Sequence, residues 1–229
     1  MKNINDATDL RKLHGLDYVK RFESRQSPMR LDRLIDRVPI SSDMTVCDFG
    51  CGNGLLMPHL CPNVDKYFGV DFSEEFIDAA NRRKSALGYN NATFVCADIN
   101  NFCAQHESCF DAGFAMDFSE HVPDDEWLDI LQSIRHAIKP NKKLYLHTPN
   151  ARFIIEIMKK HNFILKQFPE HVAVRDATEN IKLLRQAGFS NINSIALPHY
   201  NILKCLHILS CAPVIGKYFE ARLFVEATA

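Results

Sequence analysis

The chain lacks any long apolar run, and no stretch approaches the ~18 apolar residues that a membrane-spanning helix needs. It also lacks a basic excess, because 27 Lys and Arg residues stand against 28 Asp and Glu residues. A protein that grips a phosphate backbone usually has such an excess, so no nucleic acid is expected as a partner. Residues 1–15 contain no apolar signal core, and no Cys-x-x-Cys pair occurs. We therefore expect a cytoplasmic protein whose eight cysteines are free thiols, most of them in the core.

Short strand-like runs alternate with segments of helical spacing along most of the chain. The strand-like runs cover residues 45–49, 67–71, 93–97, 112–116, 143–147 and 191–196, with 222–227 as a last edge strand. Helical spacing covers residues 53–60, 74–87, 124–138 and 178–188. Strands separated by helices indicate crossover units, and hence a parallel sheet with helices on both faces.

Local signals place the helix ends. Ser73 provides a capping hydroxyl ahead of two glutamates, which suits the positive end of a helix. Pro140 is expected to end the helix that opens at Asp124. We predict one α/β domain over residues 1–229, with a helical N-terminal arm at 1–40 and a lid-like insertion at 151–170.

The most informative motif is V-C-D-F-G-C-G-N-G at residues 46–54, a strand that runs into a glycine-rich turn. Glycines there permit positive φ and let a ligand approach the backbone closely. Asp71 ends the next strand, 21 residues after Gly50, where a carboxylate would accept the ribose hydroxyls of a nucleoside. The dinucleotide fingerprint needs a glycine where Leu55 stands, and Asp48 would repel a pyrophosphate. The motif therefore favours a nucleoside with a cationic tail.

This run resembles motif I of the class I S-adenosylmethionine-dependent methyltransferases. The resemblance implies a Rossmann-like, doubly wound, mostly parallel seven-stranded sheet and S-adenosylmethionine as the cofactor. The residues expected to contact that cofactor are Tyr18, Arg30, Asp48, Gly50, Cys51, Gly52, Gly54, Asp71, Phe72, Asp98, Ile99 and Met116.

A second run, M-D-F-S-E-H-V-P-D at residues 116–124, resembles the ubiquinone-biosynthesis O-methyltransferase group. The resemblance covers about residues 28–201 and includes the P-M-R-L segment at 28–31. Asp117 departs from the group's pattern, which has a glutamate there. The residues after Asn201 are this chain's own.

Methyl transfer to a hydroxyl requires a general base, a metal ion or both. His121 and His171 are the candidate bases, with Glu120 orienting His121. In the alternative, Asp117, Glu120 and His121 hold a divalent cation such as Mg²⁺, as the resemblance implies. A purely structural role, in which the carboxylates bond backbone amides, stays open.

The expected function is S-adenosylmethionine-dependent O-methylation of a small phenol-, quinol- or sugar-like molecule. A nicotinamide-dependent oxidoreductase and a non-catalytic S-adenosylmethionine-binding protein are the alternatives. Residues 151–168 are apolar and basic, which predicts either a lid that also contacts a membrane peripherally or a helix packed on the core. The oligomeric state is not predicted.

Overall fold

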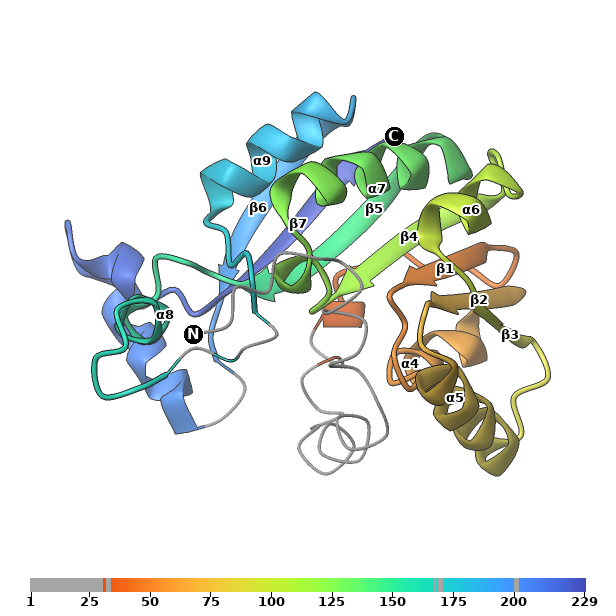
Figure 1. Cartoon of the computed structure of the whole chain (residues 1–229), viewed down its shortest axis with the longest axis horizontal. Helices are drawn as coiled ribbons and strands as arrows, with labels where there is room; N and C mark the ends of the chain where they lie inside the picture. Colours follow the sequence, from red (N-terminus) through yellow and green to blue (C-terminus); the bar gives the residue numbers. More distant parts are fainter. Residues whose placement is uncertain (1–30, 32–33, 167, 169–170, 200–201) are drawn as a thin grey trace, which may run out of the picture. The chain divides into compact units, whose positions relative to one another are not determined.

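The structure is a computed structural model of the 229-residue chain, and it describes residues 31, 34–166, 168, 171–199 and 202–229 (Figure 1). Contacts divide the chain into two compact units, Met1–Phe102 and Cys103–Ala229. Tyr18 and Arg30 lie outside the described residues, as does most of the predicted N-terminal arm at 1–40. The single-domain organisation, the arm and the lid stay predictions.

Three parallel strands form the sheet of the first unit, in the order β3-β2-β1. They are β1 (Thr45–Phe49), β2 (Lys66–Asp71) and β3 (Ala92–Cys96), within one residue of the predicted runs. Phe49 pairs with Val70, and Asp71 pairs with Cys96. The strands therefore end together, and the loops that follow them meet at one edge of this sheet.

The helices of the first unit are α4 (Met57–Leu60), the short 3₁₀ helix η1 (Cys61–Asn63) and α5 (Glu74–Leu87), and α6 (Ile99–Ala104) runs across its boundary. α5 has the predicted bounds, and the Ser73 side chain accepts a hydrogen bond from the Phe76 N–H at its start. It packs against β2 and β3. The helix predicted over residues 53–60 is wrong in its first half, because Gly54 has φ of 70° and cannot belong to a right-handed helix. The sequence reasoning did not predict α6.

Four strands form the sheet of the second unit, in the order β4-β5-β7-β6. They are β4 (Phe110–Met116), β5 (Ile138–Pro149), β6 (Ser190–Leu197) and β7 (Arg222–Thr228). β4 and β5 are parallel, whereas β7 runs antiparallel to both of its neighbours. The prediction of β7 as an edge strand is wrong. Its Leu223-Phe224-Val225 run is buried on both faces between β5 and β6, as suits an inner strand.

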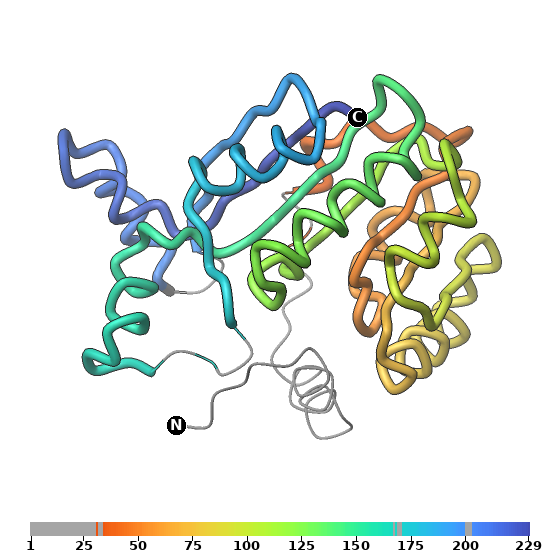
Figure 2. Tube along the Cα trace, turned by 45° about the horizontal axis from the view of Figure 1, so that its top comes forward, coloured from red at the N-terminus to blue at the C-terminus, as the bar shows by residue number. Residues whose placement is uncertain are grey.

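The remaining elements of the second unit are η2 (Ser119–His121), α7 (Asp124–Ala137), α8 (Ile154–Lys160), α9 (Ala177–Gln186), η3 (Ile202–Cys211) and η4 (Gly216–Tyr218). α7 packs on β5, α9 packs on β6, and the two helices contact each other (Figures 1 and 2). Pro140 does not end α7. Ile138 already has extended backbone angles, so the helix stops at Ala137 and Pro140 lies inside β5.

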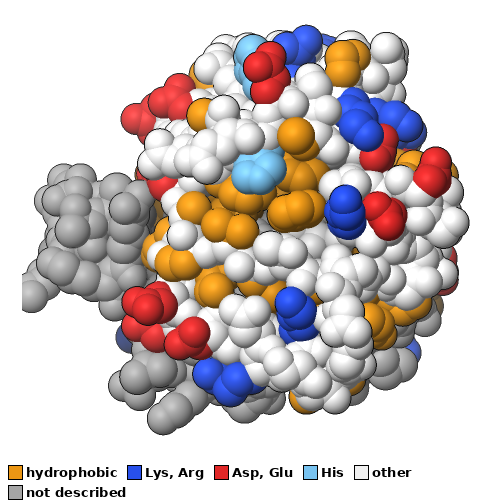
Figure 3. All heavy atoms as spheres, turned by 90° about the vertical axis from the view of Figure 1, so that its right-hand side faces the viewer, with side chains coloured by type: hydrophobic (Ala, Val, Ile, Leu, Met, Phe, Trp, Pro, Cys, Tyr) orange, Lys and Arg blue, Asp and Glu red, His pale blue; other side chains and the backbone are white. Residues whose placement is uncertain are grey.

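The surface of the protein agrees with the balanced charge of the sequence. Figure 3 shows acidic and basic side chains interspersed on one face of the molecule. All eight cysteines lie among the described residues and none is joined in a disulfide, although only four are buried, fewer than expected. Within the described ranges, no helix has the length and apolar character to cross a membrane.

Candidate active site

The glycine-rich turn follows β1 and lies against the end of β2. The N–H groups of Gly50 and Cys51 both donate to the Val70 carbonyl, at 2.9 and 3.0 Å. Gly50, Gly52 and Gly54 have φ of 72°, 50° and 70°, a region that residues with a Cβ rarely enter. The turn can adopt these positive φ values because glycine recurs at every second position.

Phe94 of β3 adds a steric requirement for glycine at two positions. A Cβ on Gly54 would lie 2.8 Å from the Phe94 ring, and a Cβ on Gly69 of β2 would lie 2.6 Å from it. Real Cβ atoms essentially never come this close to another heavy atom, so the ring occupies the space of two missing side chains. Sequence reasoning singled out Gly54 but neither Gly69 nor Phe94, because nothing local in the sequence links them.

Asp71 holds the turn from the end of β2. Its two carboxylate oxygens accept hydrogen bonds from the Gly52 N–H (2.9 Å) and the Ser73 N–H (3.0 Å). The side chain is buried, and it connects the glycine-rich turn to the start of α5. This fixes the carboxylate beside the turn, at the edge where open α/β sheets bind ligands.

Asp48 is a second carboxylate beneath the same turn, only 3% exposed. The Tyr67 hydroxyl donates to it at 2.8 Å. Burial raises the pKa of Asp48 from its usual 3.8 to about 7, the Tyr67 hydrogen bond opposes the rise, and the charge of Asp71 adds to it. Burial and the charges of both aspartates also raise the pKa of Cys51, so its thiol stays protonated. The turn thus lies over a carboxyl that titrates near neutral pH.

The remaining predicted cofactor residues lie at the ends of three strands. Phe72, after β2, is 37% exposed, whereas Ile99 is buried at the start of α6. Asp98 accepts a hydrogen bond from the Asn100 N–H at 2.9 Å and so caps that helix. Met116 ends β4 in the second unit and is partly buried.

In the second unit, Arg175 fixes the turn that follows β4. Its guanidinium donates to the carbonyls of Ser119 (2.6 Å) and Val122 (2.7 Å). It also binds the Asp124 carboxylate at 2.8 Å, at the first residue of α7. The side chain is buried, so η2 and the start of α7 are held by one cation. Sequence reasoning missed Arg175, because it lies more than 50 residues from its partners.

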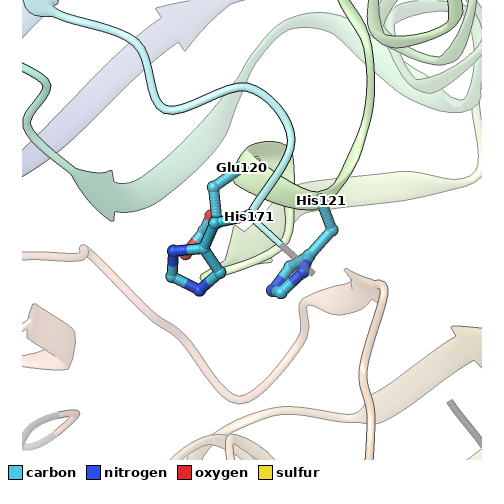
Figure 4. A group of neighbouring side chains, drawn as sticks. All are labelled: Glu120, His121 and His171. Carbon is cyan, nitrogen blue, oxygen red and sulfur yellow. The ribbon is translucent and has the colours of Figure 1, made fainter. Parts of the chain in front are cut away.

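Glu120, His121 and His171 form a cluster whose candidate ligand atoms lie within 4.8 Å of one another (Figure 4). Glu120 and His121 come from η2, and His171 comes from the segment before α9. The two imidazole rings are perpendicular, with centroids 5.0 Å apart. Glu120 is buried and accepts a hydrogen bond from Thr148 at 3.3 Å.

His171 is held as a neutral imidazole. Burial, together with the positive charges of His121 and Lys159, lowers the pKa of His171 from 6.5 to about 3. Its Nδ1 atom is buried and has no hydrogen-bond partner in the part of the chain that the structure describes. A neutral ring with an unused nitrogen is suited to bind a metal ion, and it is a weak base for a hydroxyl proton.

Asp117 points to different partners. Its carboxylate lies 3.1 Å from Nδ1 of His147 in β5 and pairs with Arg222 of β7. The residue has φ of 54°, and its N–H donates to the His147 carbonyl at 2.7 Å. The structure therefore brings Glu120 and His121 together with His171, and it places Asp117 in a buried network with His147 and Arg222. Nothing in the sequence indicated that Arg222 would pair with Asp117; it was only the first residue of a predicted strand.

Comparisons with known proteins point to a methyltransferase domain. A family model described as a methyltransferase domain matches residues 22–194. The chain is 29% identical over 174 residues to the ubiquinone biosynthesis O-methyltransferase of Xylella fastidiosa (strain 9a5c), which covers 71% of this chain and 67% of that protein. It is 27% identical over 221 residues to the protein of the same name from Aromatoleum aromaticum (strain DSM 19018 / LMG 30748 / EbN1), covering 90% and 92%.

A solved structure confirms the fold class. The crystal structure of magnesium protoporphyrin IX methyltransferase from Synechocystis PCC 6803 with bound SAH matches with a TM-score of 0.70 and 16% identity, covering 98% of this chain and 100% of that chain. The predicted α/β, mostly parallel seven-stranded sheet is therefore correct. The chain is a methyltransferase, as predicted, and the oxidoreductase and non-catalytic alternatives are wrong. Because the family model spans more than half of its length, the chain belongs to the class I S-adenosylmethionine-dependent methyltransferases.

Proposed function

We propose that the chain transfers the methyl group of S-adenosylmethionine to an oxygen atom of a small phenol-, quinol- or sugar-like molecule. The names of the curated relatives support oxygen as the acceptor atom. The observation that carries the proposal is the cluster of Glu120, His121 and His171, which gathers one buried carboxylate and two imidazoles. Such a group can remove a hydroxyl proton, or can hold a cation that makes the hydroxyl more acidic.

The first unit fits the methyl donor. A carboxylate has about four acceptor positions, so Asp71 can bind ribose hydroxyls while it keeps its two backbone hydrogen bonds. Asn53, inside the glycine-rich turn, is 1% exposed, and neither polar atom of its amide has a partner among the described residues. A buried amide without partners normally bonds a ligand or an ordered water. The donor itself supplies a methyl group already activated on a sulfonium.

Each residue of the cluster has a distinct proposed role. His121 accepts the acceptor's hydroxyl proton, and Glu120 holds the imidazole in position. His171, neutral because of its lowered pKa, is a ligand if the cluster holds a metal ion. Removing the proton makes the oxygen electron-rich, and methyl transfer then depends on alignment with the donor.

In the alternative to His121 as the base, the same cluster is the proposed metal site. Two imidazoles and a carboxylate suit Zn²⁺ or Fe²⁺ better than Mg²⁺, which prefers oxygen ligands. A bound cation would lower the pKa of the acceptor hydroxyl. This proposal keeps Glu120 and His121 from the predicted set and replaces Asp117 with His171, because the Asp117 carboxylate pairs with Arg222.

The test is a methyl-transfer screen over catechols, quinols, sugars and amines with labelled S-adenosylmethionine. We expect transfer to a hydroxyl, and a loss of at least roughly 100-fold in kcat for His121→Ala, the range of general-base catalysis. His136→Ala, at an exposed position of α7, is the matched control. Full activity of His121→Ala would refute the assigned base. Activity that survives exhaustive EDTA treatment and is not raised by Zn²⁺, Fe²⁺, Mn²⁺ or Mg²⁺ would refute the metal site.

We also propose that residues 151–170 act as a lid, and that 151–168 contact a membrane that carries a lipophilic acceptor. Phe153 anchors the start of α8 in the core, whereas Phe163 and Phe168 are exposed. The Phe168 ring contacts Lys159 (5.1 Å from Nζ to the ring centroid) and the His171 ring (5.3 Å between centroids). Movement of this segment would therefore change the contacts of His171 in the cluster.

Hydrogen exchange with and without S-adenosylhomocysteine and acceptor tests the lid. We expect amides of residues 161–168 to exchange fast in the ligand-free protein and to be protected in the ternary complex. Equal protection in both states would favour a helix that is simply packed on the core.

A further inference from the structure

Two segments that lie far apart in the sequence build the cluster of the candidate active site. Glu120 and His121 belong to η2, whereas His171 belongs to the segment before α9 (Figure 4). The two imidazole rings meet at right angles, with their centroids 5.0 Å apart. Because a displacement of about 1 Å at a reacting group costs roughly 100-fold in rate, the cluster depends on the contacts that hold the two segments together.

The segment before α9 is joined to the backbone of η2. The Ala173 N–H donates to the Glu120 carbonyl at 3.1 Å. The Arg175 guanidinium donates to the Ser119 carbonyl at 2.6 Å and to the Val122 carbonyl at 2.7 Å. Three carbonyls of this one turn thus accept hydrogen bonds from the segment that carries the second histidine of the cluster.

Arg175 contributes the strongest part of this junction. Its side chain is buried, and its hydrogen bonds to the two carbonyls come from a charged donor, which makes them roughly twice as strong as neutral ones. Its third partner, the Asp124 carboxylate, is 72% exposed, and an ion pair with an exposed partner contributes little. The carbonyls of Ser119 and Val122 are therefore the contacts through which Arg175 acts.

β5 holds the first part of the same turn through side chains. The Ser119 hydroxyl donates to the Thr148 hydroxyl at 3.2 Å, and the Thr148 hydroxyl donates to the Glu120 carboxylate at 3.3 Å. These bonds fix Ser119 and Glu120 but not the end of the turn, where His121 lies. Arg175 fixes that end, because it binds the carbonyl of the residue that follows His121.

We propose that Arg175 is a positioning residue for methyl transfer: it ties the end of η2 to the segment before α9 and thereby holds His121 against His171 in the orientation that proton removal requires. Arg175 acts through backbone carbonyls. The proposal rests on His121 as the base of the proposed function, and it adds a residue that determines how well this base works. Loss of Arg175 lowers kcat and leaves the binding of donor and acceptor unchanged, since only the reacting geometry changes.

The first measurement is structural and needs no acceptor. Nuclear Overhauser contacts between the rings of His121 and His171 report whether the two segments still meet. We expect these contacts in the wild type and their loss in Arg175→Met. Contacts that persist unchanged in the folded variant would overturn the proposal.

The second measurement is a double-mutant cycle in kcat, with labelled S-adenosylmethionine and the catechol, quinol or sugar that the wild type methylates fastest. We expect Arg175→Met to lower kcat by roughly 100-fold, while the donor affinity and the acceptor KM stay within about twofold. In a His121→Ala background the same substitution should cost less than about threefold, because the base that Arg175 positions is gone. Losses that multiply would show that Arg175 acts independently of His121, and would overturn the proposal.

Three further variants separate positioning from a general loss of stability. Arg175→Lys keeps the charge but lacks the planar fork that bonds both carbonyls, so we expect a folded enzyme whose kcat is lower by at least roughly tenfold. Asp124→Asn removes only the exposed ion pair and should keep the wild-type kcat. Arg135→Met is the matched control, because Arg135 is a partly buried arginine of α7 that lies against Gly188 after α9. An equal loss of kcat in Arg135→Met would attribute the effect to stability and overturn the proposal.

The cycle also distinguishes failure of this proposal from failure of the proposed function. Full activity of His121→Ala would refute the assigned base, and the role of Arg175 with it. An impaired His121→Ala beside folded, fully active Arg175→Met and Arg175→Lys would overturn the role of Arg175 alone.

Discussion

Replacing Asp48 with asparagine should change how the stability of the protein depends on pH. The folded protein holds the Asp48 proton up to about pH 7, whereas an unfolded aspartate loses it near its usual pKa of 3.8. Between these values the folded state binds more protons than the unfolded state, so the free energy of unfolding falls as pH rises. Integrated over the window, the loss amounts to about 4 kcal/mol at most and is complete above pH 7.

Asparagine resembles the protonated carboxyl and can still accept the Tyr67 hydrogen bond. We therefore expect Asp48→Asn to match the wild type near pH 4, and to be more stable by up to about 4 kcal/mol at pH 8. Denaturant titrations of the ligand-free protein at several pH values measure this difference. Asp78→Asn, at an exposed position of α5, serves as the control. Parallel stability curves for wild type and Asp48→Asn would refute the reasoning.

Three further substitutions test other parts of the account. Asp71→Ala should weaken S-adenosylmethionine binding by a few kcal/mol, since each charge-assisted hydrogen bond contributes about 1.5–3 kcal/mol; unchanged affinity in calorimetry would remove the ribose assignment. Gly69→Ala should lower the free energy of unfolding by about 1–3 kcal/mol, because the new methyl group overlaps the Phe94 ring; denaturant unfolding at the wild-type midpoint would contradict this. Arg175→Met should destabilise the second unit, because each buried carbonyl left without its donor costs about 1–3 kcal/mol. Thermal unfolding measures the effect, and an unchanged melting temperature would contradict the role of Arg175 in holding η2 and the start of α7.

Much of the first unit could be predicted because its signals are local. Strand, turn and helix follow one another within residues 45–87, and Ser73 and the alternating glycines act on their immediate neighbours. The short α4 shows the limit of this reasoning. A helical spacing of apolar residues extends back to Asn53, but the positive φ of Gly54 prevents a helix there.

The second unit was predicted less well because long-range pairing decides it. A run of apolar residues does not say which strands flank it, so the inner position of β7 between β5 and β6 could not be read from residues 222–228. Helical spacing grouped Asp117 with Glu120 and His121. The structure separates them, because Arg222 and His147 take up the Asp117 carboxylate and His171 approaches from 50 residues further along.

The most direct test of the central claim is mass-spectrometric identification of the methylated product formed from labelled S-adenosylmethionine. The account predicts that one labelled methyl group appears on a hydroxyl oxygen of a small molecule, with one S-adenosylhomocysteine released per product. It also predicts that Glu120→Gln and His121→Ala bind the donor as tightly as the wild type but form little product. Label on nitrogen or carbon, or undiminished product from both variants, would contradict it.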